Sequence, residues 1–346
     1  MNCVEIKREE KIIPIVNYLK GYAIITIAIM HVFFLMGNTP SFILKPVMLG
    51  GSGVHVFFFC SGLGLYYSYL HQKTGYLEFL KKRFFKLYLP YIFIVFITFL
   101  VQGVYYGDDK YRVLLSHVLL YKMFIPAYDE TFGAQFWFIS TIFQLYFVFI
   151  PMCKIKNKTQ NSGLFFSVFL AISLLWWCIC YFFGVGSIRV FNSFFLQYIW
   201  EFALGFVIAE SIYKGKNIKL PIRGLFVSAV LGLGLQFAMS LQNGNLKLFN
   251  DIPAFIGYIS LALLLSKCSI IYEIARRVSF YSYELFLVHV LIYSSVLHFI
   301  GNCGYFIRLG CGAFAFIISF VVGYYYKKFC IFASKKMRSK VLWNPK

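Results

Sequence analysis

Ten long apolar segments follow one another along the 346-residue chain, and each is long enough to cross a lipid bilayer. A transmembrane helix needs about 20 predominantly apolar residues, within a range of about 17–25. The loops between these segments are too short to hold a soluble domain. The sequence therefore predicts an all-α integral membrane protein, a polytopic bundle of about ten transmembrane helices. The predicted spans lie at 21–37, 51–70, 88–106, 134–153, 164–183, 193–213, 222–241, 252–272, 280–300 and 309–328.

The charged residues predict how this bundle sits in the membrane. Hydrophobic residues make up 60% of the chain, and 33 Lys and Arg face only 13 Asp and Glu, a net charge of +20. In a soluble protein such an excess would suggest nucleic-acid binding. With the N-terminus in the cytoplasm, however, 26 basic residues fall on the cytoplasmic side and 7 on the other. This asymmetry follows the positive-inside rule, so we expect both termini in the cytoplasm and no nucleic-acid partner.

The bounds of the first and last predicted spans divide the chain into three parts. We expect a cytoplasmic N-terminal segment at 1–20, a membrane domain at 21–328 and a basic cytoplasmic tail at 329–346. The apolar segment 113–127 contains His117 and Lys122, so it is predicted to be interfacial or re-entrant rather than an eleventh span.

No metal site is predicted. The nine cysteines form no pair of CxxC clusters, and no cysteine and histidine grouping has the spacing of zinc ligands. Several cysteines lie inside apolar runs, where buried free thiols are the simplest interpretation.

Ionisable side chains within the spans are candidate functional residues, because each costs about 2.5–3.5 kcal/mol to insert. His31 follows Lys20 by eleven residues, which is close to three helical turns and places both on one helix face. The rise of about 16.5 Å puts His31 near the middle of the bilayer and Lys20 at its cytoplasmic edge. Histidine transfers protons near neutral pH, but a structural histidine bonded to a neighbouring helix fits the spacing equally well.

Two further spans carry polar groups of this kind. Glu201 lies near the centre of the sixth span, where it could orient His31, accept a substrate hydrogen bond, form a structural ion pair or be a neutral acid. In the ninth span, Ser282, Phe286 and His289 share one helix face. His289 is a second candidate at mid-membrane depth, and hydrogen bonding between helices is the alternative.

A basic stretch precedes the third span. Arg83 and Lys86 are spaced i, i+3 and would project from one helix face. A guanidinium can bind phosphate through two hydrogen bonds, and a lysine adds a point charge. The alternative is an ordinary cytoplasmic anchor.

Small residues are concentrated at 50–65, which is typical of close helix packing, with a substrate channel as the alternative. His55, near the outer end of that helix, is expected to be interfacial. Trp137 and Phe138 begin the fourth span as interface aromatics or a gate.

Six segments together resemble the acyltransferase-3 family of integral membrane acyltransferases. They occur in the family's order over about 20–330: NYLKGYAIITIAIMHVF, GVHVFFFCSGLGL, KRFFKLYLP, FWFISTIFQLYFVFIP, WEFALGFVIAE and FYSYELFLVHVLIY. Lys86 stands where the family motif has a second arginine, which keeps the charge but loses the bidentate fork.

The resemblance implies an O-acyltransferase in the bacterial plasma membrane. It would move an acyl group, acetyl from acetyl-CoA, onto a hydroxyl of a cell-surface or lipid-linked glycan. The implied catalytic residues are His31 and Glu201. The implied acyl-CoA ligands are Lys20, Arg83 and Lys86. The residues implied to contact substrate are Ser61, Trp137, Tyr283 and His289.

Two other classes of protein fit the same sequence. A glycan transporter or flippase would also have ten spans and mid-membrane ionisable residues, although no internal repeat of the transporter kind is visible. A membrane scaffold would leave His31 and Glu201 unexplained.

Overall fold

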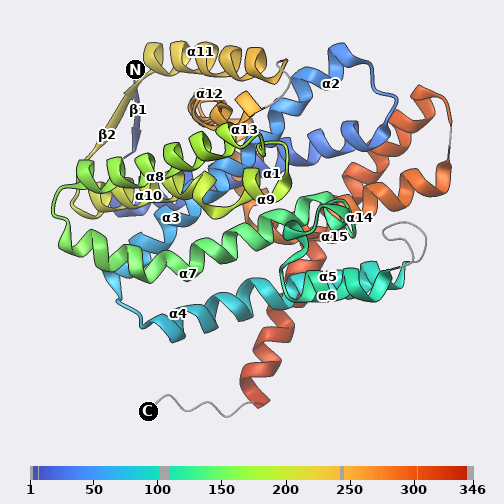
Figure 1. Ribbon diagram of the computed structural model, residues 1–346, viewed down its shortest axis with the longest axis horizontal. Helices are drawn as coiled ribbons and strands as arrows, with labels where there is room; N and C mark the ends of the chain where they lie inside the picture. The colour runs from blue at the N-terminus through green and yellow to red at the C-terminus, as the bar shows by residue number, and fades with distance from the viewer. Residues whose placement is uncertain (1–2, 7, 102–108, 242–244, 302, 341–346) are drawn as a thin grey trace.

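The computed structural model confirms the polytopic all-α architecture (Figure 1). It describes residues 3–6, 8–101, 109–241, 245–301 and 303–340, and within them ten helical segments are long and apolar enough to cross a membrane. In chain order the helices and strands are β1 (Cys3–Ile6), α1 (Arg8–Met36), α2 (Ser41–Met48), α3 (Gly53–His71), α4 (Tyr76–Arg83), α5 (Leu89–Leu100), α6 (Lys110–Val118), α7 (Trp137–Lys158), α8 (Ser162–Phe182), α9 (Arg189–Ser193), α10 (Phe195–Tyr213), β2 (Ile218–Pro221), α11 (Ile222–Ser240), α12 (Asp251–Leu265), α13 (Ser269–Val278), α14 (Ser282–Ile300) and α15 (Tyr305–Lys340).

The third span differs most from its predicted bounds of 88–106. A π-helical turn at Phe84–Tyr88 joins α4 to α5, so the apolar segment runs from Tyr76 to Leu100, and 102–106 lie outside the described residues. The segment 113–127 forms only α6 and short 3₁₀ turns, and the part of it that follows α6 holds no helix long enough to span. The prediction that it is not an eleventh span is confirmed.

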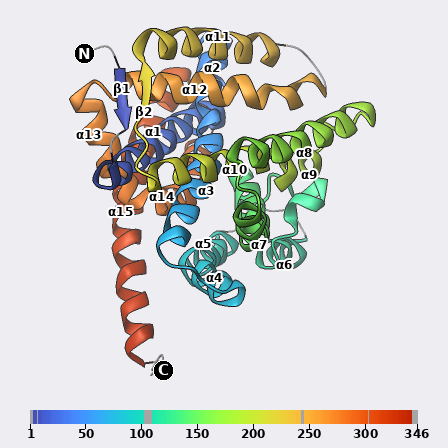
Figure 2. The ribbon, with the colours of Figure 1, turned by 90° about the vertical axis from the view of Figure 1, so that its left-hand side faces the viewer.

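Figures 1 and 2 show how the helices are layered. Helices α1, α3 and α10 run through the middle, with α11 and α12 on one side and α4 to α7 on the other. The C-terminal part of α15 projects beyond the rest of the bundle in both views. Many large apolar side chains remain exposed on the helices, among them Phe182, Leu235 and Phe306, as expected for surfaces that face lipid.

Helices α3 and α10 pack closely because glycines line their contact. A Cβ added to Gly62 would lie 2.2 Å from the Phe202 carbonyl oxygen, and one added to Gly205 would lie 2.5 Å from the Leu63 backbone nitrogen. Such small residues let transmembrane helices approach each other. The helix-packing interpretation of segment 50–65 therefore holds for Gly62.

A two-stranded ribbon, which the apolar pattern did not predict, joins the N-terminus to the loop after the sixth span. Strands β1 and β2 pair antiparallel, with Cys3 opposite Pro221 and Ile6 opposite Ile218. The pairing places the N-terminal segment and this lysine-containing loop together. That arrangement agrees with the charge asymmetry, which assigns both to the cytoplasmic side.

Candidate active site

A cavity of about 460 Å³ opens among α1, α3, α4, α7, α14 and α15. Its volume is in the range of small-molecule and cofactor sites. The charged residues of its lining are Lys20, Arg83, Lys86, Lys327 and Glu284. Four cations and one acid give this cavity an excess of positive charge, and the structure thus brings together the three cations that the sequence singled out.

The π-helical turn explains how Arg83 and Lys86 reach the same cavity. Arg83 precedes the turn and Lys86 lies within it, where the backbone is wider than an α-helix. Tyr283 donates a hydrogen bond of 2.7 Å to the Leu87 carbonyl and so ties the turn to α14. The Arg83 guanidinium lies 5.5 Å from the centre of the Phe79 ring, and its buried Nε has no hydrogen-bond partner in the described part of the chain.

Lys327 and Glu284 were not predicted as site residues. The Lys327 ammonium donates to Glu284 Oε1 at 3.0 Å, and Glu284 is only 2% exposed. The other oxygen, Glu284 Oε2, is buried without a partner among the described residues. Glu284 could have been found from the sequence, because it is an acidic residue within the ninth predicted span. Lys327 resembles any other cytoplasmic lysine until the fold places it in the cavity.

Aromatic rings close the deep end of the cavity. Cys60, Ser61 and Gly64 of α3 form part of its wall, and the interpretation of segment 50–65 as a substrate channel stays a prediction. Beyond them lie three phenylalanines. The Phe138 ring centre is 6.0 Å from that of Phe57 and 5.2 Å from that of Phe286.

Two histidines meet beside Phe286, and neither His31 nor His289 is among the residues that line the cavity. The Nδ1 atom of His31 lies 3.0 Å from Nε2 of His289, and the rings of Phe286 and His289 are 6.0 Å apart. His289 is fully buried, whereas His31 is half-buried. The sequence suggested each histidine separately, but their contact comes from the packing of α1 against α14.

Hydrogen bonding determines which nitrogen of each neutral histidine carries the proton. The Nδ1 atom of His289 lies 3.0 Å from the Leu285 carbonyl, which can only accept, so this nitrogen donates. The Nε2 atom of His289 must then accept from Nδ1–H of His31. The remaining nitrogen of His31, Nε2, therefore has a free lone pair and can act as a base.

Glu201 does not lie beside His31, so the prediction that it orients His31 is wrong. Its Oε1 atom accepts a hydrogen bond of 2.7 Å from Nδ1 of His55, whose Nε2 lies 3.8 Å from Oδ1 of Asp251. His55 is only 9% exposed, so it is buried in the bundle, and its predicted interfacial depth stays a prediction. Packing of α3 onto α10 buries this end of α3.

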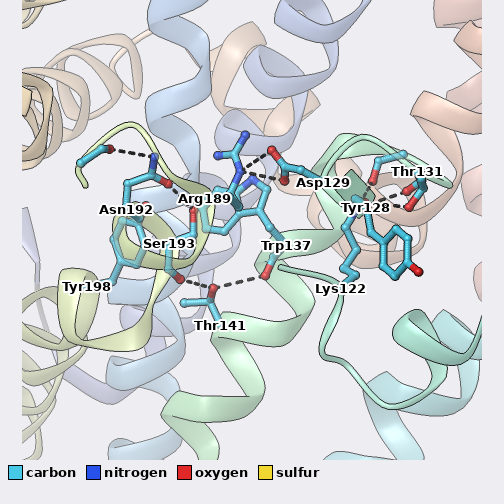
Figure 3. A network of polar contacts seen from close by, with 12 residues as sticks. Lys122, Tyr128, Asp129, Thr131, Trp137, Thr141, Arg189, Asn192, Ser193 and Tyr198 are labelled. Carbon is cyan, nitrogen blue, oxygen red and sulfur yellow. Dashed lines mark hydrogen bonds and ion pairs between the residues drawn. The ribbon is translucent and has the colours of Figure 1, made fainter. Parts of the chain in front are cut away.

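Trp137 belongs to a polar network at the N-terminal end of α7 (Figure 3). Arg189 lies over the Trp137 ring at 5.7 Å and donates from Nε to both Asp129 oxygens, at 2.9 and 3.1 Å. The Trp137 ring also stacks on Tyr198, with centroids 5.9 Å apart. Since Trp137 precedes Phe138 directly, this network begins where the aromatic end of the cavity stops.

A buried lysine anchors the same network. The Lys122 ammonium donates to the carbonyls of Thr131 and Gly133 at 3.2 and 3.1 Å. Burial lowers the pKa of Lys122 to about 7, because desolvation disfavours the charged form. Burial also holds the pKa of neighbouring His117 well below its usual value, and the charge of Lys122 adds to the effect.

The fold and this cavity define a polytopic membrane protein with a basic cavity, and Phe286 of the cavity lining lies beside a pair of hydrogen-bonded histidines. An acyltransferase domain model matches residues 13–326, nearly the whole chain. The chain therefore belongs to the acyltransferase-3 family, and it is a multi-pass membrane acyltransferase. No curated protein and no solved structure matches it significantly.

Proposed function

We propose that this protein is an O-acetyltransferase of the bacterial plasma membrane that transfers acetyl from acetyl-CoA to a hydroxyl of a cell-surface or lipid-linked glycan. The observation that carries the proposal is one cavity whose lining includes Lys20, Arg83 and Lys86 and also Phe286, whose ring lies 6.0 Å from that of His289, the hydrogen-bond partner of His31. A thioester bound by its phosphates at the basic end would point its acyl group toward the histidines.

The basic end of the cavity suits the donor. Coenzyme A carries a pyrophosphate and a 3′-phosphate, and cations bind such groups through charge-assisted hydrogen bonds. The unpartnered Nε of Arg83 offers one such donor. Lys327 would be a fourth cation, held by Glu284 when no phosphate is present.

The histidine pair supplies the chemistry. In the proposed reaction, Nε2 of His31 accepts the proton of the acceptor hydroxyl, and the hydroxyl oxygen bonds to the thioester carbonyl carbon. The carbon–sulfur bond then breaks, and the proton passes from His31 to the departing sulfur. His289 does not touch the substrate in this scheme. It is a positioning residue, because its Nε2 accepts the Nδ1–H of His31 and stabilises the imidazolium that forms.

The glycan acceptor would approach from the end of α7 that carries Trp137. Sugars stack on aromatic faces and hydrogen-bond to nearby charged groups, and Trp137 combines both within the Arg189 and Asp129 network. The sequence of rings from Trp137 through Phe138 to Phe286 marks a direct route between this surface and the histidines.

The test is transfer of label from [¹⁴C]acetyl-CoA to glycan in membranes that contain the full-length protein. Wild type should label the glycan, and His31→Ala should abolish labelling while the protein stays folded and membrane-bound. Full labelling by His31→Ala would refute the role of His31. Movement of glycan across the membrane without acetyl-CoA would instead identify a transporter.

A further inference from the structure

Three ionisable side chains gather away from the cavity, where α3, α10 and α12 meet. His55 comes from α3, Glu201 from α10 and Asp251 from the first residue of α12. One ligand atom from each lies within 4.8 Å of the other two. None of the three lines the basic cavity, and the proposed reaction uses none of them.

The charges of this cluster do not balance. Glu201 is fully buried and His55 is 9% exposed, while the Asp251 side chain is 14% exposed. Two carboxyl groups therefore share one imidazole in an apolar bundle, and each would be costly as an uncompensated buried charge. Among the described residues, no Lys or Arg forms an ion pair with either acid. A divalent cation would neutralise both carboxylates while the imidazole stays neutral.

Unpartnered oxygens at the same place point to a missing cation rather than to a closed hydrogen-bond network. Glu201 Oε2 is buried without a partner among the described residues, and so is Oε1 of Gln197. Gln197 is 1% exposed, and its amide nitrogen donates to Asp251 Oδ2 at 2.7 Å, which holds its free oxygen beside the cluster. Both free atoms are electron-pair donors of the kind that metal ions bind.

The hydrogen bond of His55 also has the arrangement of a metal ligand. Its Nδ1 donates to Glu201 Oε1 at 2.7 Å, so the lone pair lies on Nε2. Metal-binding histidines commonly donate their other nitrogen to a carboxylate in this way. The distance of 3.8 Å from Nε2 to Asp251 Oδ1 is too long for a hydrogen bond. It suits two ligands that each lie about 2.0–2.2 Å from one ion.

We propose that His55, Glu201 and Asp251 form a binding site for a divalent transition-metal ion, Zn²⁺ or Mn²⁺, with His55 Nε2 and Asp251 Oδ1 as direct ligands and the Glu201 carboxylate completing the site. One nitrogen and several carboxylate oxygens favour these ions over soft metals. The site links α3, which forms a wall of the cavity, to α10 and α12. Its role is to hold these three helices together. The sequence predicted no metal because the ligands are 146 and 50 residues apart, so no spacing motif exists.

The test uses full-length protein purified in detergent and depleted of metal by chelation. Titration calorimetry with Zn²⁺ or Mn²⁺ should give about one site per chain, and the metal should raise the thermal unfolding midpoint. His55→Gln and Asp251→Asn should each weaken binding by at least tenfold. The matched control is Glu210→Gln on α10, the helix of Glu201, because Glu210 pairs with Lys156 and Lys214 instead. It should bind like wild type.

Each other outcome overturns the proposal. If depleted wild type binds neither ion more tightly than the His55→Gln and Asp251→Asn double variant, the cluster is a proton-sharing hydrogen-bond network. If Mg²⁺ or Ca²⁺ binds but Zn²⁺ and Mn²⁺ do not, His55 is not a ligand. The wild-type titration needs no variant to fold. Because acetyl transfer is not the readout, the result is independent of the proposed enzymatic function.

Discussion

Replacing His289 tests the histidine pair most directly. His289→Leu removes the acceptor for Nδ1–H of His31 but keeps an apolar side chain of similar size between α14 and α1. His289→Gln offers an amide oxygen that can accept the same hydrogen bond. His289 is not among the cavity-lining residues, so neither change touches the proposed acetyl-CoA site.

The size of the effect follows from the bond that is lost. A hydrogen bond to a charged group contributes about 1.5–3 kcal/mol, and one between neutral groups about 0.5–1.5 kcal/mol. The imidazolium of His31 exists only after proton transfer, so the loss falls mainly on the transition state. The difference between the two bonds is about 1–1.5 kcal/mol, and at about 1.36 kcal/mol per tenfold change in rate kcat should fall by about five- to 13-fold in His289→Leu. The KM for acetyl-CoA should stay within about twofold.

The assay is the initial rate of acetyl transfer at varied acetyl-CoA concentration. His289→Gln should recover much of the lost kcat, because its oxygen replaces the lost acceptor. The matched control is His298→Leu, an exposed histidine in the last turn of the same helix, which should behave like wild type. A kcat within twofold of wild type in His289→Leu would refute the argument. So would equal losses in the Leu and Gln variants of a protein that is still folded.

Three other predictions concern the cavity, the outer network and the helix packing. Lys327→Gln should raise the KM for acetyl-CoA about tenfold, equivalent to about 1.4 kcal/mol, whereas the exposed neighbour Lys328→Gln should not. The pKa of Lys122 is about 7 in the folded protein, compared with an ordinary value of 10.5. Between pH 7 and pH 10.5 the folded state therefore binds fewer protons than the unfolded state. Stability should therefore rise with pH from about 7 to about 10, and Lys122→Met should remove that slope in thermal unfolding. Gly62→Ala should destabilise the protein by about 1–3 kcal/mol, while lipid-facing Gly234→Ala, whose Cβ would meet no atom within 4 Å, should not.

Each of these has a clear contrary result. Equal KM values for the Lys327 and Lys328 variants would remove Lys327 from the donor site. An unfolding midpoint that rises with pH in Lys122→Met as it does in wild type would mean that another group titrates. Equal stability of Gly62→Ala and wild type would show that α3 and α10 can separate without cost.

The predicted cavity residues illustrate what sequence can reach. Lys20, Arg83 and Lys86 were found from spacing and family resemblance, and the structure places all three in one cavity. Their signal is local, because a cation at the edge of an apolar segment stands out within a few residues. Ser61 and Tyr283 also line this cavity, whereas Trp137 lies in the outer network.

Other parts of the site could not be predicted. The partner of His31 is 258 residues away, and that of Glu201 is 146 residues away. In a soluble helix, one apolar face shows which side packs inward. Here the helices are apolar on all sides, since lipid and neighbouring helices are both apolar. The pattern therefore does not show which faces meet, and this is why the sequence could not show that Glu201 lies beside His55.

The sequence by itself determined the ten spans and the side on which most basic residues lie. Both follow from properties of short segments, since about 20 apolar residues cross a bilayer and lysines and arginines are retained in the cytoplasm. Only the tertiary structure decided which polar groups meet. It paired His31 with His289, Lys327 with Glu284, and Glu201 with His55. Those pairs depend on close contacts between helix faces, such as the one that Gly62 and Gly205 permit, and these contacts form only when distant spans pack together.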